Sequence, residues 1–256
     1  MVRLAGDPAL KPIETGYLSD KERRIKAMFD AIAPRYDLLN DLLSFRQHRY
    51  WRKLAVKLAK IRPGDVCLDV CTGTGMFAAQ ISAVVGKSGK VVGTDFSIPM
   101  MLRADCSTKH GANGTVRMTA GNAEHLSFPD NCFNAVTVGF GVRNVNNVRA
   151  AISEMMRVVV PEGAVVILEF TKPDSRRKFV NFYLSKVLPQ IGGLLSRKEA
   201  YTYLPESMKE FLNKQELSAC MAEAGLINIS VKELNFGTVC IHTGFKPAIN
   251  PKGLKI

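Results

Sequence analysis

The sequence is poor in cysteine and histidine for its 256 residues, with six of the first and four of the second. No two cysteines form a C-x-x-C pair, and none stands beside a histidine at the spacing typical of zinc sites. Six cysteines are also too few for a disulfide scaffold of this size. We therefore expect neither a structural metal nor a disulfide framework, and the thiols fit a reducing compartment: Cys67, Cys71, Cys106, Cys132, Cys220 and Cys240.

Long hydrophobic runs are also missing. No window reaches the roughly 18 uninterrupted apolar residues that a membrane span requires, and the N-terminal region lacks the continuous apolar segment of a secretion signal. We therefore expect a cytoplasmic protein. With 46% hydrophobic and 23% charged residues, the composition is that of an ordinary globular protein, with one large domain or two small ones.

The charge is unevenly distributed along the chain, which has 35 Lys and Arg against 23 Asp and Glu and a net charge of +12. Residues 1–62 carry +7 and residues 172–214 carry +5, whereas residues 63–171 carry −1. Basic flanks around a neutral centre suggest contact with an anionic surface, either nucleic acid or lipid headgroups. A basic face that only keeps the protein in solution is the alternative.

From about residue 65 to 171, short β-branched runs alternate with helical patterns. This alternation is typical of βαβ units, in which helices cover both faces of a parallel sheet. Two further strands, with a tight turn near Asn235 to Gly237, can form a hairpin that closes the sheet. The expected strands cover 66–70, 90–95, 115–120, 135–140, 164–170, 227–235 and 237–245, and the expected helices cover 76–85, 99–110, 147–159 and 214–224. The expected fold class is therefore α/β.

Two basic segments lie outside this alternation. Residues 1–62 are expected to form an N-terminal helical cap, because 20–60 reads as two or three amphipathic helices. Residues 63–256 form the sheet domain, with a helical insertion at 172–213. Within that insertion, Phe179 to Leu195 is mostly apolar but contains a lysine, a proline and two glycines, which favours a broken helix pair over a membrane span.

A glycine turn, Gly73-Thr74-Gly75, follows the first expected strand and opens a helix. Glycine lets a ligand approach the backbone closely, and the helix N-terminus offers free N–H groups. With Ala78 the turn also satisfies the loose dinucleotide pattern G-x-G-x-x-A. Asp69, at the end of the strand, favours a different ligand, since a pyrophosphate gains nothing from a carboxylate whereas an ammonium group does. The turn therefore indicates a cofactor that carries an amino acid.

Polar residues also follow the second and third expected strands. Asp95 ends the second strand, where an acid can accept hydrogen bonds from both ribose hydroxyls, although a helix cap or turn residue is the alternative. Asn122 and Ala123 follow the third strand, where an amide and a backbone N–H can meet an adenine edge. Three such sites at successive strand ends make a stronger case for a cofactor site than any one of them alone.

These residues resemble the class I S-adenosylmethionine-dependent methyltransferases, and more narrowly the quinone-biosynthesis C-methyltransferases that make menaquinone and ubiquinone. The resemblance runs from about residue 25 to 247, and its most family-specific run is Phe140-Gly141-Val142-Arg143-Asn144. It implies a Rossmann-like, seven-stranded, mostly parallel sheet with an antiparallel last strand, an N-terminal helical cap and a helical lid insertion. It also implies S-adenosyl-L-methionine as cofactor, with contacts at Thr74, Asp95, Asn122 and Ala123, in agreement with the residue-based assignment. Further matching runs are Tyr36-Asp37 with Asn40 and Ser44, Trp51-Arg52, Leu68 to Gly75, Gly121 to Glu124, Glu154 to Val158, Tyr201 to Leu204 with Glu206-Ser207, and His242-Thr243-Gly244.

Four positions depart from the family pattern without removing an expected cofactor contact. Met76 stands where an acid or aromatic commonly follows the glycine turn, and Asn134 replaces an aspartate. Ser127 replaces a proline, and Glu162 replaces a glycine. They suggest a divergent member of the family.

The reaction that the resemblance implies is C-methylation of a polyprenylated quinol, either demethylmenaquinol or the benzoquinol of the ubiquinone pathway. Methyl transfer from a sulfonium requires mainly that the acceptor carbon be held near the methyl group and that water be excluded. A cation or donor beside the acceptor hydroxyl would stabilise the developing oxyanion. Arg143 and Asn144, after the fourth strand, suit this role, although Arg143 can instead be a structural ion-pair partner.

Other aromatic and histidine residues are weaker candidates. Tyr201 and Tyr203 can pack over an aromatic acceptor or fill the lid interface. His242 is a catalytic candidate through the resemblance, while a buried structural histidine is the alternative in a strand. The remaining histidines, His48, His110 and His125, form no constellation in the sequence.

Two other functions compete with quinol methylation. One is a class I methyltransferase acting on another lipid or a small aromatic acceptor. The other is a basic nucleic-acid-binding protein on a Rossmann-like scaffold, but the basic segments lack the interleaved aromatics of common RNA modules. We therefore expect a quinol substrate and peripheral contact with an anionic membrane through the basic flanks, and no nucleic acid. The sequence leaves a homodimer open.

Overall fold

A seven-stranded β-sheet forms the centre of the computed structural model, which describes residues 19–104, 116–172 and 198–248. Its strand order is β3-β2-β1-β4-β5-β7-β6, and β7 runs antiparallel to both of its neighbours. The expected α/β class and seven strands, with the antiparallel strand last, are confirmed. The strands are β1 (Val66–Val70), β2 (Lys90–Asp95), β3 (Val116–Ala120), β4 (Phe133–Gly139), β5 (Val159–Phe170), β6 (Ile227–Leu234) and β7 (Val239–Phe245).

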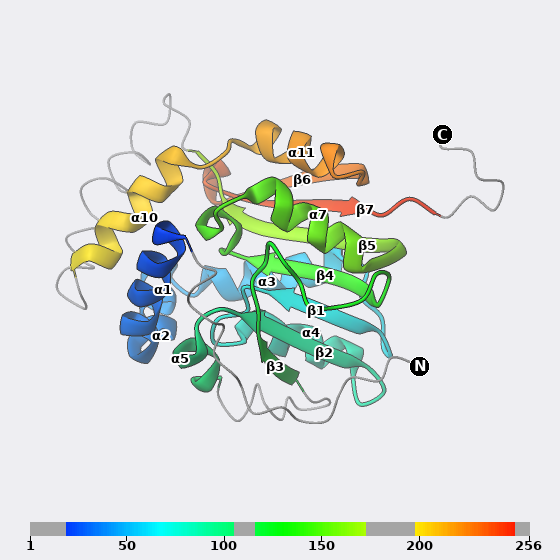
Figure 1. Cartoon of the computed structure of the whole chain (residues 1–256), viewed down its shortest axis with the longest axis horizontal. Coiled ribbons are helices and arrows are strands. Elements are labelled where there is room, and N and C mark those ends of the chain that lie inside the picture. Colours follow the sequence, from blue (N-terminus) through cyan, green and yellow to red (C-terminus); the bar gives the residue numbers. More distant parts are fainter. Residues whose placement is uncertain (1–18, 105–115, 173–197, 249–256) are drawn as a thin grey trace.

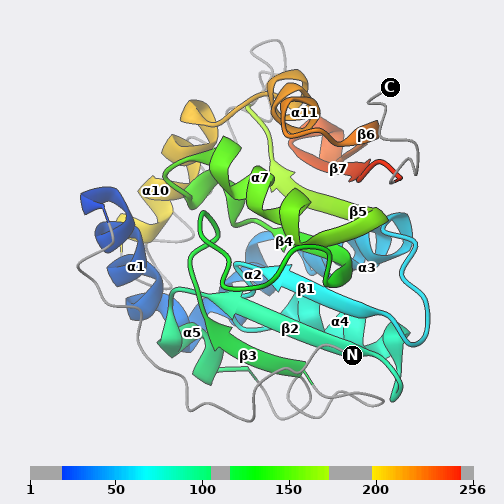
Figure 2. The same cartoon turned by 45° about the vertical axis from the view of Figure 1, so that its right-hand side comes forward.

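Helices cover both faces of the sheet and one of its ends. In Figure 2, α3 and α4 lie behind the sheet and α7 lies in front. In Figure 1, α1, α2, α5 and α10 gather at the left end of the molecule. The α-helices are α1 (Asp20–Ile32), α2 (Tyr36–Leu43), α3 (Gln47–Leu58), α4 (Met76–Val85), α5 (Ile98–Leu102), α7 (Val148–Val158), α10 (Lys198–Glu210) and α11 (Lys214–Glu223). Short 3-10 turns are η2 (Ala33–Arg35), η3 (Val142–Asn144) and η5 (Asn235–Gly237). The arrangement can be followed along the chain in Figure 1.

The core lies on both faces of the sheet because the parallel strands are apolar on both sides. Leu68 and Val70 of β1 face a cluster completed by α7 and α11, whereas Cys67 faces a second cluster under α3 and α4. Trp51 of α3 is only 4% exposed and belongs to this second cluster. The N-terminal segment, expected to hold two or three helices, forms three, and the last of them packs directly on the sheet.

Two elements end or begin elsewhere than the sequence pattern predicts. The helix expected over 99–110 ends at Leu102, since the chain turns at Arg103, and 105–110 lies outside the described residues. The strand expected from 164 begins at Val159, directly after α7, and bends at Glu162. Glu162 has a φ of +63°, the conformation that glycine adopts most readily, which explains why the family pattern has glycine there.

No helix in the described part of the chain is long and apolar enough to cross a membrane. The apolar stretch from Phe179 to Leu195, for which a broken helix pair is expected, lies outside the described residues. Of the insertion at 172–213, the structure describes Lys172 and the segment from α10 onward, and α10 contacts α1 and η3. The insertion and the N-terminal cap therefore meet at the carboxyl end of the parallel strands, where ligands bind in open α/β sheets.

Candidate active site

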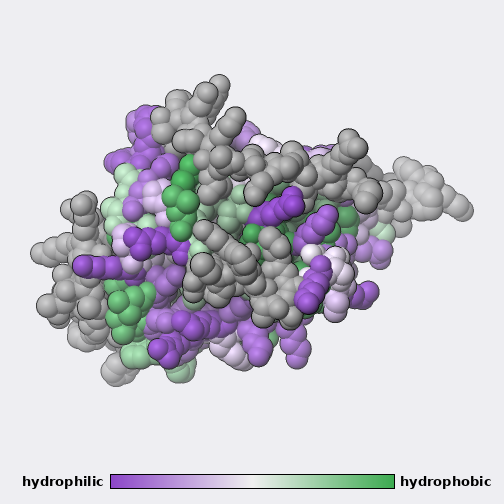
Figure 3. Space-filling model, turned by 90° about the horizontal axis from the view of Figure 1, so that it is seen from below, coloured by the Kyte–Doolittle hydropathy of each residue, from purple (hydrophilic) through white to green (hydrophobic). Residues whose placement is uncertain are grey.

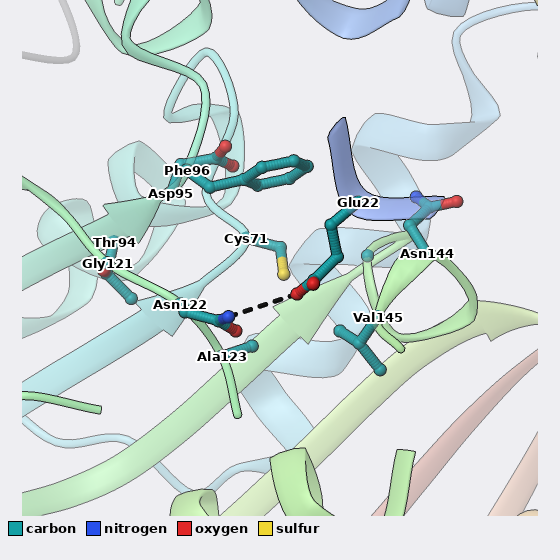
Figure 4. Close-up of a pocket in the computed structure, with 11 residues that line it drawn as sticks. Glu22, Cys71, Thr94, Asp95, Phe96, Gly121, Asn122, Ala123, Asn144 and Val145 are labelled. Carbon is teal, nitrogen blue, oxygen red and sulfur yellow. Dashed lines mark hydrogen bonds between the residues drawn. The ribbon is translucent and has the colours of Figure 1, made fainter. Parts of the chain in front are cut away.

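A pocket lies at the carboxyl ends of β1, β2, β3 and β4, with α1 across it (Figure 4). Its space is about 410 Å³, part of it open to solvent. Each of these four strands contributes residues at or just after its carboxyl end. The lining consists of Glu22, Cys71, Thr94, Asp95, Phe96, Gly121, Asn122, Ala123, Gly141, Asn144 and Val145.

The glycine turn lies beside this pocket, two residues after Cys71, which lines it; Gly73, Thr74 and Gly75 do not line it. Gly73 and Gly75 have φ values of +56° and +79°, which residues with a side chain rarely adopt, and Gly75 precedes the first turn of α4. Thr72 anchors the turn to β2 through its backbone N–H, which donates to the Thr94 carbonyl over 3.0 Å. Gly141 meets the turn from β4, and a Cβ there would lie 2.4 Å from that of Cys71. A side chain at position 141 would therefore collide with Cys71, which explains the glycine there.

Asp95 lies in the pocket and holds the glycine turn. Its Oδ2 accepts a hydrogen bond from the Gly73 N–H over 2.8 Å, and its Oδ1 accepts one from the Ser97 N–H over 2.8 Å. The side chain is 7% exposed, and burial raises the pKa of Asp95 to about 6. Asp95 therefore holds the turn, which was the alternative that the sequence left open. It also lies in the pocket, where its remaining lone pairs can accept hydrogen bonds from a ligand.

Asp69 takes a different position from the one expected. It lies beneath the glycine turn, 1% exposed, and does not line the pocket. Its Oδ2 accepts from the Thr72 hydroxyl over 2.7 Å, and its Oδ1 accepts from the Thr137 hydroxyl over 2.8 Å. Burial raises its pKa to about 6. This geometry does not support the direct ammonium contact expected of Asp69, because both oxygens tie the turn to β4 instead.

A second acid in the pocket, besides Asp95, is Glu22 of α1, which the sequence did not single out. Asn122 donates through Nδ2 to Glu22 Oε1 over 3.1 Å, while its Oδ1 accepts from the Glu124 N–H over 2.9 Å. Figure 4 shows Glu22 pointing from α1 toward Asn122 and Cys71. The available signal was a capping box between Ser19 and Glu22, which predicts a helix start but not a pocket. Ala123 lines the same wall, as expected.

Two further acids of the N-terminal helices hold the cap against the site. The Thr74 hydroxyl donates to Asp37 Oδ1 over 2.7 Å, and the Ser97 hydroxyl donates to Asp30 Oδ1. Asp30 belongs to α1 and Asp37 to α2. Thr74, expected as a cofactor contact, is buried and does not line the pocket, and its hydroxyl is engaged by the cap.

Asn144 and Tyr203 meet at the other side of the pocket. The Tyr203 hydroxyl, from α10, donates to Asn144 Oδ1 over 2.8 Å, and Asn144 lines the pocket. Burial raises the pKa of Tyr203, so its hydroxyl stays protonated as a donor. The insertion and η3 are thus joined beside the pocket. Tyr201 lies in α10 as well, but its side chain is outside the described residues.

Arg143 forms a buried ion pair. Its NH1 donates to Glu169 Oε1 over 2.7 Å and to the Phe140 carbonyl over 2.8 Å. The guanidinium lies over the Phe170 ring, 5.3 Å from its centroid. Its Nε is buried and has no hydrogen-bond partner. Arg143 is next to the pocket through Asn144, but it does not line it.

His242 lies in the middle of β7, away from the pocket. It is 1% exposed, and its Nε2 donates to the Lys214 carbonyl at the start of α11 over 3.0 Å. Burial lowers its pKa. This placement does not support the catalytic role expected of His242. It agrees with the alternative interpretation, a buried structural histidine.

His48 has partners that the sequence did not reveal. Its Nε2 lies 2.7 Å from Asp41 Oδ1, and its Nδ1 accepts from Arg52, which also lies over the Phe140 ring. Since Nδ1 accepts, Nε2 carries the proton and donates to Asp41. Burial, then the nearby Arg52 charge, lowers the pKa of His48. These hydrogen bonds join α2 to α3.

Comparison with known proteins gives both a family and close relatives. The model of the ubiE/COQ5 methyltransferase family matches residues 18–246. The ubiquinone/menaquinone biosynthesis C-methyltransferase UbiE of Geobacter sulfurreducens is 44% identical over 232 residues, which cover 90% of this chain and 91% of that protein. A demethylmenaquinone methyltransferase of Geobacillus kaustophilus is 38% identical over 229 residues, covering 88% of this chain and 98% of that protein.

Solved structures with the same fold are more distant in sequence. An S-adenosylmethionine-dependent methyltransferase of Thermotoga maritima, described as a possible histamine N-methyltransferase, is 17% identical with a TM-score of 0.62, covering 86% of this chain and 99% of that one. The [4+2]-cyclase SpnF is 15% identical with a TM-score of 0.65, covering 95% and 100%. A cyclase among the neighbours illustrates that this fold alone does not specify a reaction.

Proposed function

The chain belongs to the ubiE/COQ5 methyltransferase family, and from this premise we propose that it methylates a ring carbon of a polyprenylated quinol, using S-adenosylmethionine. The acceptor is demethylmenaquinol or the benzoquinol of the ubiquinone pathway. The observation that carries the proposal is the family match over residues 18–246, with relatives named for these two pathways at 36–44% identity. The pocket at the strand ends supports it by offering a cofactor site beside a second polar wall.

The pocket residues fit S-adenosylmethionine, which supplies an activated methyl group when bound. We propose that Asp95 accepts hydrogen bonds from the ribose hydroxyls and that Asn122 and Ala123 meet the adenine edge. The Phe96 ring, which borders the pocket in Figure 4, offers a face for stacking. Gly73 and Gly75 leave room for the amino-acid end beside the turn. Asp69 supports this wall from below through Thr72 and Thr137.

On the acceptor side, we propose that Asn144 and Tyr203 contact the quinol ring and its hydroxyl. Arg143 stabilises the developing oxyanion from behind them. Support for this role comes from its buried Nε–H, a donor without a partner, since such groups are uncommon in native structures. The cap helices α1 and α2 and the insertion helix α10 border this space and exclude water from it.

We propose that the protein works in the cytoplasm and binds the membrane surface peripherally. A polyprenyl tail keeps its quinol within a bilayer, so the enzyme has to reach the headgroup layer. The +7 charge of residues 1–62 and the +5 charge of residues 172–214 support attraction to anionic lipid.

The test of the function is the quinone composition of a strain that lacks this protein. We expect a quinone lighter by one methylene group to accumulate, detected by mass spectrometry of lipid extracts. Reintroducing the parent gene should restore the methylated quinone, whereas the Asp95→Ala variant should restore much less. An unchanged quinone profile would contradict the proposal and favour another lipid or a small aromatic acceptor.

Cofactor affinity is expected to depend on pH through Asp95. Because its pKa is about 6 in the cofactor-free protein, the carboxyl protonates below that pH and accepts hydrogen bonds less well. Affinity should therefore fall by up to about tenfold for each pH unit below about 6. Titration calorimetry between about pH 5 and 7 measures this, and Asp95→Asn should remove the component due to this group. Equal pH slopes in both proteins would contradict it.

The same shift has a defined effect on stability. The folded-state pKa of Asp95 is raised above its ordinary value of 3.8. Its contribution to the free energy of unfolding is therefore full below about pH 4 and is lost as the pH rises through about 6. Urea unfolding of the cofactor-free protein should show Asp95→Asn gaining stability relative to the parent over that interval.

A further inference from the structure

The turn between α2 and α3 displays large apolar side chains on the protein surface. Leu38 and Leu42, one turn apart on α2, are 59% and 46% exposed, Phe45 in the turn is 76% exposed, and Tyr50 of α3 is 62% exposed. They are four of the nine large apolar residues that are exposed within the described part of the chain, although they span only 13 positions. We call this group, together with the basic residues described next, the α2–α3 corner.

Basic side chains surround these apolar ones. Arg46 and Arg49 flank the turn with side chains 77% and 53% exposed, and Lys53 is exposed one helical turn after Arg49. The acid among them, Asp41, is 16% exposed and is held by His48, Arg46 and Arg49. The α2–α3 corner therefore presents apolar side chains inside a positively charged border. Toward the left of Figure 3, at the end where α1, α2 and α5 lie in Figure 1, hydrophobic side chains stand among hydrophilic ones.

The backbone of the turn is held in this exposed conformation. Phe45 and Arg46 have φ values of +49° and +61°, which are strained for residues with large side chains. The Arg46 N–H donates to the Asp41 carbonyl over 2.8 Å, and the Ser44 N–H and hydroxyl both donate to the Asn40 carbonyl. The hydrogen bonds that run from Asp41 through His48 to Arg52 tie the turn to α3. A strained, well-anchored turn whose aromatic side chain points to solvent suggests a functional surface.

The corner also adjoins the active site. Asp37, next to Leu38 on α2, accepts the hydrogen bond from Thr74 of the glycine turn. An α-helix with its side chains is about 10 Å across. The outer surface of α2 therefore lies about that far from the glycine turn. A surface bound there would lie next to the glycine turn, at the same edge of the sheet as the pocket.

We propose that the α2–α3 corner is the membrane-docking surface of this protein, with Phe45, Leu42 and Leu38 entering the headgroup boundary of an anionic bilayer. The basic border selects anionic lipid, and the apolar side chains bury area at the level where aromatic and leucine residues bind interfaces. This deepens the proposed function, since it names the surface through which the enzyme reaches a bilayer-embedded quinol. A second copy of this chain is the competing occupant of the corner, and the oligomeric state in the test below distinguishes it from a bilayer.

The test is binding of the full chain to vesicles of phosphatidylcholine with and without phosphatidylglycerol. Phe45→Asn is expected to weaken binding to the anionic vesicles by roughly tenfold, the scale for exposing one large apolar side chain. Asparagine tolerates positive φ, so this variant should fold normally. Arg46→Glu with Lys53→Glu should abolish the preference for anionic lipid, and added salt should weaken parent binding.

Phe236→Asn is the matched control. Phe236 is 79% exposed with a φ of +55°, much like Phe45, but it lies in η5, where the nearest charged residues in the sequence are Lys232 and Glu233 rather than several basic residues. It should leave vesicle binding unchanged. Equal loss in both variants, or no loss in Phe45→Asn, would overturn the proposal. Conversion of a dimer to a monomer by Phe45→Asn, with vesicle binding intact, would show instead that the corner joins two copies of the chain.

Activity separates this proposal from the function on which it rests. Phe45→Asn should methylate a short-tailed, water-dispersed quinol at the parent rate and a vesicle-embedded quinol more slowly. Parent-like rates on both substrates would overturn docking through the corner while leaving the function intact. If the parent methylates neither quinol but Phe45→Asn still loses vesicle binding, the function fails and the docking surface stands.

Discussion

Replacing Arg143 by glutamine is expected to destabilise the protein and to slow methyl transfer. The loss of stability should be about 3–5 kcal/mol, because Glu169, 1% exposed, is left as an uncompensated buried charge. The loss in kcat should be about 100- to 1,000-fold if Arg143 also stabilises the quinol oxyanion, the usual effect of removing one such donor. Cofactor KM should change less, since the interaction forms mainly in the transition state.

A double variant separates the two roles. Adding Glu169→Gln to Arg143→Gln removes the unpaired charge and should recover most of the stability, measured by urea unfolding. Turnover of a demethylated quinol should stay low in the double variant. If turnover recovers together with stability, Arg143 acts only as an ion-pair partner and the catalytic proposal is wrong. Cofactor binding, measured on the same preparations, confirms that the neighbouring site is intact.

Asp95→Ala is expected to weaken S-adenosylmethionine binding by about 1.5–3 kcal/mol, or about 10- to 150-fold. The carboxylate is lost both as an acceptor for the ribose hydroxyls and as the group that holds the Gly73 and Ser97 N–H groups. Titration calorimetry measures the effect directly.

Asp65→Ala provides the control for this variant. Asp65 is also an aspartate at a strand end, but it precedes β1 at the opposite edge of the sheet and accepts from the Arg62 N–H. It should leave cofactor affinity unchanged. Unchanged affinity in a folded Asp95→Ala protein, judged by circular dichroism, would remove Asp95 from the cofactor site.

The sequence by itself determined the sheet and the edge of it at which the pocket lies. Strands buried on both faces read as β-branched runs, and their alternation with helices implies that all their carboxyl ends meet at one edge. Gly73, Asp95 and Asn122 therefore come together simply because each follows a strand. The positive φ values at Gly73 and Gly75 are likewise a local requirement that the residue type reveals. No knowledge of distant contacts was needed for these assignments.

Tertiary packing decided the roles of the charged and aromatic residues. Asp69 ends a strand just as Asp95 does, yet it lies beneath the glycine turn because Thr72 and Thr137 enclose its carboxylate. Glu22 enters the pocket only because α1 crosses the sheet edge, 100 residues from its partner Asn122 in the chain. His48 pairs with Asp41 because two helices meet at a sharp turn. Periodicity and spacing report local conformation and burial, whereas the approach of distant side chains depends on how helices pack, and only the folded structure determines that.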